Sequence, residues 1–131
     1  MDLQDNVKVC LLSEKNIQLG TASAKGIPNV CYIGCRYFRE DGSLVMIDNF
    51  MRKTKANVLE NPNVAVLVLG DNGAFQLKGL CRYVDKGEEY DAARAWMKAR
   101  NKNMPAKGAL VIELTEVYNS KPGEHAGEKI A

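Results

Sequence analysis

The chain has 131 residues, of which 46% are hydrophobic, so one domain with its own core is expected. Eighteen basic and sixteen acidic residues leave a net charge of +2, and no run of like charge marks a nucleic-acid-binding arm. The longest apolar run, residues 64–69, is far shorter than the ~18 residues of a membrane helix, and the acidic start of the chain is unlike a signal peptide. We therefore expect a cytoplasmic protein that does not enter membranes.

Residue counts and absent motifs exclude several classes of chemistry. The only histidine, His125, lies in a polar C-terminal segment, which argues against a Ser-His-Asp triad or a histidine-based metal site. The four cysteines contain no C-x-x-C pair, and neither G-x-G-x-x-G nor a P-loop occurs among the glycines. We predict no metal site, and we expect the cysteines to be reduced and mostly buried.

Hydrophobic periodicity predicts a short first helix, a series of strands and two further helices. Residues 3–14 carry apolar side chains at helical spacing, with Asp5 or Asn6 as a cap. A short helix is predicted at residues 53–60 and a longer one at residues 88–102. The predicted strands span residues 17–22, 30–38, 44–48, 64–69, 75–84 and 109–117.

These elements predict a mainly β fold with flanking helices, in which six antiparallel strands form a small barrel. A parallel Rossmann sheet would need a helix after nearly every strand, and the pattern lacks them. The apolar run at residues 64–69 is expected to be a strand buried on both faces. One domain is expected over residues 1–131, with its core at about 17–117 and a polar tail at 118–131.

Basic residues crowd the start of the short helix predicted at residues 53–60. Arg52, Lys53 and Lys55 surround Thr54, a plausible N-cap. The positive end of a helix dipole disfavours each such cation by about 0.3–1 kcal/mol. A bound phosphate would offset this repulsion, because free N–H groups, the hydroxyl and the cations would converge on a dianion. The alternative is a set of solvated surface charges beside an ordinary cap.

The string K-T-K-A-N-V-L-E-N-P-N-V-A-V at residues 53–66 follows an alternating strand and an Asp-Gly hairpin. This pattern resembles the flavin-binding split-barrel superfamily, typified by pyridoxamine 5′-phosphate oxidase and by the small FMN-binding proteins of anaerobic bacteria. The similar order of elements extends from about residue 17 to residue 117. The resemblance implies a six-stranded split β-barrel of the Greek-key type and a homodimer that binds FMN at its subunit interface.

The resemblance also implies where FMN would be bound. The basic and hydroxyl cluster at residues 52–54 would hold the phosphate, and residues 32–34 would lie along the isoalloxazine ring. Residues 47–48 would contact the ring and ribityl edge, with Met51 at the bend, and Gln76 would contribute from the same or the partner subunit. The positions carried over are Tyr32, Ile33, Gly34, Ile47, Asp48, Met51, Arg52, Lys53, Thr54 and Gln76.

The implied chemistry is that of the cofactor, and no catalytic side chain is assigned. FMN transfers hydride or single electrons, which predicts a flavin-dependent oxidoreductase or an electron carrier with a small-molecule donor and acceptor. True pyridoxamine phosphate oxidases carry arginine, histidine and tryptophan residues in their C-terminal part, whereas the last arginine here is Arg100 and the only tryptophan is Trp96. We therefore expect no oxidation of a vitamin B6 phosphate. For the dimer, Trp96, Met97 and Tyr118 are candidate contacts.

Two alternatives keep or change the fold. The superfamily also includes members that bind a deazaflavin or haem in the same groove, so these ligands compete with FMN. A small β-barrel module of another class would bind single-stranded nucleic acid through exposed aromatic rings and a basic groove, or would serve as a structural dimer module. A net charge of +2 is a weak electrostatic attraction for nucleic acid, so we expect neither nucleic acid nor membrane as a partner.

Overall fold

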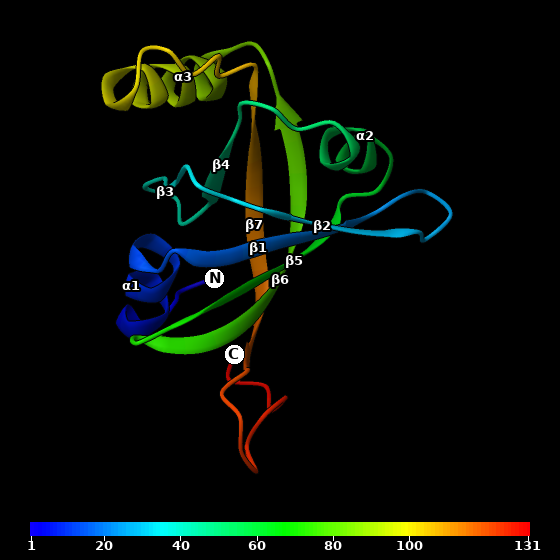
Figure 1. The fold of residues 1–131 in the computed structure, drawn as a ribbon, viewed down its shortest axis with the longest axis vertical. Coiled ribbons are helices and arrows are strands. Elements are labelled where there is room, and N and C mark those ends of the chain that lie inside the picture. The colour runs from blue at the N-terminus through cyan, green and yellow to red at the C-terminus, as the bar shows by residue number, and fades with distance from the viewer.

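Seven antiparallel strands form one curled sheet, and three helices pack against it (Figure 1). The computed structural model describes residues 1–131. In chain order the elements are α1 (Asp5–Ser13), β1 (Asn16–Ala22), β2 (Pro28–Tyr32), β3 (Arg36–Phe38), β4 (Leu44–Asp48), α2 (Lys53–Glu60), β5 (Asn63–Gly70), β6 (Gly73–Val84), α3 (Glu88–Arg100) and β7 (Gly108–Asn119). Neighbouring strands follow the order β2-β1-β5-β6-β7-β4-β3. The helix α3 and the C-terminal segment lie at opposite ends of the molecule (Figure 1).

The mainly β fold with flanking helices is confirmed, but the expected count of six strands is wrong. The strand predicted at residues 30–38 is divided into β2 and β3, which form the two edges of the sheet. Between them, Ile33 N donates to Ile17 O at 3.3 Å, and Cys35 O accepts from Ile47 N at 3.0 Å. Residues 33–35 therefore carry the chain from one edge of the sheet to the other and hold the sheet in its curl.

The helices lie close to their predicted positions. Two of them, α2 and α3, differ in the charged residues at their ends. In α3, acidic residues occupy the first turn and basic residues the last, as the helix dipole favours. The first turn of α2 carries no acidic residue. None of the helices combines the length and apolar character that crossing a lipid bilayer requires.

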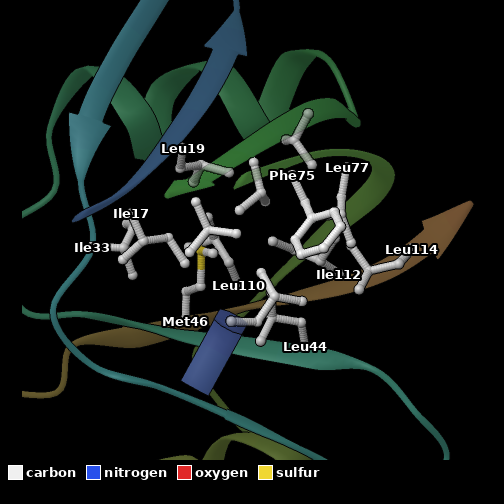
Figure 2. Close-up of a cluster of buried hydrophobic side chains, with 14 of the residues drawn as sticks. Ile17, Leu19, Ile33, Leu44, Met46, Phe75, Leu77, Leu110, Ile112 and Leu114 are labelled. Carbon is white, nitrogen blue, oxygen red and sulfur yellow. The ribbon is translucent and has the colours of Figure 1, made fainter. Parts of the chain in front are cut away.

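The inner face of the sheet buries the main hydrophobic core, which α1 and α2 cover. Side chains from strands distant in sequence point toward one another there, including Leu19, Met46, Leu77 and Leu110 (Figure 2). Leu110, near the start of β7, is 0% exposed. At ~25 cal/mol per Å² of apolar surface removed from water, such residues supply most of the stabilising free energy.

A second apolar cluster lies on the outer face of β4 and β7, beneath α3. Val45, Ile47 and Met97 belong to it, so β4 is buried on both faces. The expectation that residues 64–69 would be the two-sided strand is wrong, because no helix covers the outer face of β5, and Leu67 remains 37% exposed. Met97, at 3% exposure, is buried within the chain, so its side chain is not free to contact a partner.

Replacement of Leu110 by Ala tests the main core. We expect Leu110→Ala to lower the free energy of unfolding by about 2–5 kcal/mol, because it leaves a cavity among fully buried neighbours. Leu80→Ala is the matched control, since Leu80 on the neighbouring strand is 44% exposed and its loss should cost about 0.5 kcal/mol or less. Urea unfolding of both variants measures the difference, and equal losses would contradict this account of the core.

Candidate functional site

A groove of about 590 Å³ opens between β2, the β2–β3 connection and the segment that joins β4 to α2. Arg52 on this segment and Lys53, the first residue of α2, supply the only formal charges among the lining side chains. The groove is therefore cationic where α2 begins and uncharged elsewhere. The predicted cofactor contacts that line it are Tyr32, Ile33, Gly34, Ile47, Met51, Arg52, Lys53 and Thr54.

The cationic end combines two exposed side chains with the start of a helix. Arg52 is the N-cap residue of α2, and no side chain caps the helix. The first turn-closing bond runs from Ala56 N to Arg52 O at 3.0 Å. The N–H groups of residues 53–55 precede this bond, and such groups at a helix start carry partial positive charge. Arg52, Lys53 and these N–H groups together make an electropositive end suited to an anion.

Thr54 does not cap the helix, contrary to the prediction. It is the second residue of α2 and is 4% exposed. Its hydroxyl donates to Cys31 Sγ at 3.2 Å and accepts from Asn29 Nδ2 at 3.1 Å. A hydroxyl has one proton to donate, and that of Thr54 is used on Cys31. Since both of its partners lie on β2, Thr54 ties the start of α2 to that strand. The exposed groups beside it are Arg52 and Lys53.

Lys55, the third cation near the helix start, does not line the groove. Its Nζ lies 5.0 Å from the ring centroid of Tyr83, within cation–π range. The three basic residues therefore divide into two that face the groove and one that faces the barrel.

Asp48 does not line the groove, although its chain neighbours Ile47 and Asn49 do, and it is completely buried. Its Oδ2 accepts from the Tyr83 hydroxyl at 2.6 Å, and its Oδ1 accepts from Met51 N at 2.9 Å. Lys107 Nζ is 4.0 Å from the same carboxylate. Burial, and then the bond to Asp48, raise the pKa of Tyr83 well above its ordinary value. Asp48 thus shapes the turn that precedes Arg52.

Gln76 is separated from the groove. It lies on β6, opposite Leu67 of β5 and Tyr118 of β7, and it does not line the groove. Its half-buried side chain shares the outer face of the sheet with these two neighbours.

The uncharged end of the groove has a gap in its side chains at Gly34. A Cβ placed on Gly34 would meet no atom within 4 Å, so this stretch of backbone is open to a flat group. Exposed Tyr32 and Phe50 flank the opening, at 76% and 73% exposure. No carboxylate and no imidazole line the groove, so its walls offer apolar contact and backbone groups.

Sequence reasoning missed several lining residues: Asn29, Val30, Cys31, Cys35, Asn49, Phe50 and Met104. The neighbours of predicted positions could have been found by extending each segment by one to three residues. Met104 could not, because it reaches the groove only through the loop after α3. That loop is attached to the β4–α2 segment by Ala106 N donating to Asn49 Oδ1 at 3.0 Å.

All four cysteines are free thiols, of which two are buried and two are half-buried. Cys10 and Cys81 are buried as expected, and burial raises the pKa of both thiols, that of Cys81 to about 12. Cys31 and Cys35 are half-buried and line the groove. No cluster of three or more His, Cys, Asp or Glu side chains is arranged to hold a metal ion.

Two relatives match most of this chain. An uncharacterized protein of Methanocaldococcus jannaschii is 38% identical over 123 residues, which cover 92% of this chain and 83% of the relative. The pyridoxine/pyridoxamine 5′-phosphate oxidase of Crocosphaera subtropica is 42% identical, and the match covers 86% of this chain. This chain spans only 58% of the length of that oxidase.

Solved structures of proteins named for different ligands share the fold. An FMN-binding protein of Syntrophomonas wolfei superimposes with a TM-score of 0.74 and 19% identity, covering 86% of this chain and 82% of its own. The haem storage protein HutZ of Vibrio cholerae gives 0.70 and 18%, with coverages of 91% and 95%. An F420 reductase gives 0.64 and 19%, with coverages of 88% and 98%. At these identities the likeness concerns the fold alone.

A sequence model of the family described as pyridoxamine 5′-phosphate oxidase matches residues 3–121, which include every strand and the whole groove. The match covers nearly the entire chain, and the order of elements that suggested a split barrel is present in the fold. The chain belongs to the pyridoxamine 5′-phosphate oxidase family.

Proposed function

We propose that this protein binds FMN in the groove and acts as a flavin-dependent oxidoreductase or electron carrier for small molecules. The observation that carries the proposal is the division of the groove into a cationic end at Arg52 and Lys53 and an uncharged, open stretch at Gly34. FMN has the same division, with a phosphate at one end and a flat ring at the other. Membership of the family and the FMN-binding fold neighbour support the choice of ligand.

At the cationic end, Arg52 and Lys53 would hold the phosphate together with the first N–H groups of α2. A guanidinium and an ammonium beside free amides match the charge and the acceptors of a phosphate dianion. Thr54, whose hydroxyl is bonded to Cys31, would act mainly by fixing the helix start.

At the other end, the backbone at Gly34 would lie against the ring, and Tyr32, Ile47 and Met51 would border it. FMN supplies hydride or single-electron transfer, and the protein supplies orientation and partial exclusion of water. Because no carboxylate or imidazole lines the groove, we infer that protons exchanged during turnover come from water.

Two substitutions separate the two ends of the groove. Lys53→Ala should weaken FMN about tenfold to a hundredfold, as expected for a lost charge-assisted hydrogen bond of about 1.5–3 kcal/mol, and should leave riboflavin affinity unchanged. Gly34→Val should weaken both flavins, because its side chain fills the open stretch. Fluorescence titration with FMN and riboflavin measures both effects. Lys25→Ala, at an exposed turn, is the control cation. Equal FMN affinity in wild type and Lys53→Ala would place the phosphate elsewhere.

We further infer a homodimer that closes the groove through the outer face of the sheet. One row of side chains crosses five strands there: Tyr32, Gln18, Leu67, Gln76 and Tyr118. The row contains no charged residue, and its first member also lines the groove. A second copy seated on this row would bury exposed apolar surface and would border the ring end of the groove.

The neighbouring row supports the same face. Val30, Gly20 and Ala65 lie side by side on β2, β1 and β5, and they line a shallow hollow of about 510 Å³. Val30 is 69% exposed and also lines the groove. Small side chains beside an exposed apolar one leave room for a side chain of a second copy, which suits a packed interface.

Sedimentation velocity tests the dimer and its face. Wild-type protein should sediment as a dimer at micromolar concentration, and Leu67→Glu should shift it toward monomer because it places a charge in an apolar contact. Leu12→Glu is the matched control, since Leu12 on α1 is 49% exposed and lies outside the row. A monomer that retains flavin, or a Leu67→Glu variant that remains dimeric, would contradict this interface.

The fold neighbours make F420 and haem the competing ligands. Haem iron needs an axial ligand, commonly histidine, and the only histidine lies in the exposed C-terminal segment outside the groove. FMN is therefore favoured over haem. Visible absorption of the purified protein distinguishes FMN from haem. A flavin spectrum supports the proposal, and a Soret band overturns it.

Oxidation of pyridoxamine 5′-phosphate is not part of the proposed function. This substrate brings a second phosphate, and the groove holds no cations besides Arg52 and Lys53. We expect FMN-loaded protein incubated with pyridoxamine phosphate in air to form no pyridoxal phosphate, measured by its absorbance. Turnover at about 1 per second or more, ordinary for an enzyme, would show that another part of the assembly supplies the missing cations.

A further inference from the structure

We infer that Tyr83, a residue of β6 outside the groove, is the positioning residue for the cationic end of the flavin site. This inference rests on the proposed function and concerns how Arg52 and Lys53 are held in place. Tyr83 contacts both ends of residues 48–55, the segment that carries these two cations.

The first contact is at the start of the segment. The Tyr83 hydroxyl donates to Asp48 Oδ2 at 2.6 Å, and the other oxygen of the same carboxylate accepts from Met51 N at 2.9 Å. Asp48 thus transmits the position of Tyr83 to the turn that leads into Arg52. Asp48 is completely buried, so water cannot replace a lost donor at low cost.

The second contact is at the end of the segment. Lys55 Nζ lies 5.0 Å from the centroid of the Tyr83 ring. This contact draws Lys55 away from the groove, and it fixes the first turn of α2 on which Lys53 also lies. One side chain therefore holds residues 48 and 55, while the intervening Arg52 and Lys53 face the groove.

The space for this arrangement is provided by Gly108 at the start of β7. A Cβ on Gly108 would overlap the Tyr83 hydroxyl oxygen. Any larger residue at this position would displace the hydroxyl from Asp48. The same neighbourhood is attached to the segment by Lys107 N donating to Asp48 O at 2.8 Å.

If Tyr83 positions the phosphate contacts, its loss should change the affinities for FMN and riboflavin differently from a general loss of stability. Loss of the hydroxyl should disturb the phosphate contacts more than the ring contacts. Of the residues that would border the ring only Met51 belongs to residues 48–55, whereas Tyr32 and Gly34 do not. General destabilisation would weaken FMN and riboflavin by the same factor. The ratio of the two affinities therefore separates the two roles.

The experiment compares Tyr83→Phe with wild type in the full-length protein. We expect FMN affinity to fall by about tenfold or more, the loss expected for one charge-assisted contact, while riboflavin affinity falls by a much smaller factor. Tyr37→Phe is the matched control, because the Tyr37 ring stacks on Trp96 and lies outside the segment. Equal losses for both flavins, or no loss for either, would overturn the inference.

Two further measurements keep the inference independent of the cofactor and of the single variant. In flavin-free protein, the Met51 amide should exchange faster with solvent in Tyr83→Phe than in wild type when followed by NMR, and unchanged exchange would overturn the positioning role. Gly108→Ala should reproduce the selective loss of FMN affinity without removing the hydroxyl, and retention of full FMN affinity would count against it. If wild type binds no flavin, the proposed function fails, while the Met51 exchange still decides this inference.

Discussion

The anchoring of Ile33 in the core is the constraint on which the rest of the structure depends. Ile33 is 4% exposed, and its N–H donates to Ile17 O on β1. Two residues later, Cys35 bonds to Ile47 on the other side of the curl. The two contacts go to different strands, because β2 pairs with β1 and β3 pairs with β4, and the chain crosses from one edge of the sheet to the other between them. The break that closes the sheet also leaves Gly34 exposed without a side chain, and this produces the uncharged part of the groove.

The cationic part of the groove depends on a buried polar network instead. Asp48 terminates β4 and receives donors from Tyr83 and from the turn at Met51. Such a carboxylate is costly to bury unless its oxygens are bonded, so the turn has little freedom. Cations that would disfavour an isolated helix start are held there by the surrounding sheet, since α2 has no capping side chain and only eight residues. The local arrangement therefore favours an anion in the groove over isolated charges.

The helix α3 covers one part of the outer face of the sheet and leaves the other part exposed. The part formed by β4 and β7 packs beneath α3 and builds the second apolar cluster. The part formed by β2, β1, β5 and the start of β6 has no helix over it and carries the uncharged row from Tyr32 to Gln76. Since Tyr32 borders both this face and the groove, a partner on the exposed part and a ligand in the groove would share a boundary.

The sequence by itself determined the fold class, most element positions and the segment of interest at residues 52–54, because periodicity, turn residues and misplaced charges are local signals. It did not determine the division of residues 30–38 into two strands, since alternation continues through the break and only Ile33's place in the core reveals it. The tertiary structure decided that β4 rather than β5 is buried on both faces, because α3 covers only β4 and β7. It also decided that Thr54 bonds to Cys31 and that Tyr83 reaches Asp48 past Gly108. These contacts join residues 23 and 35 positions apart, and no local pattern encodes a distance of that kind.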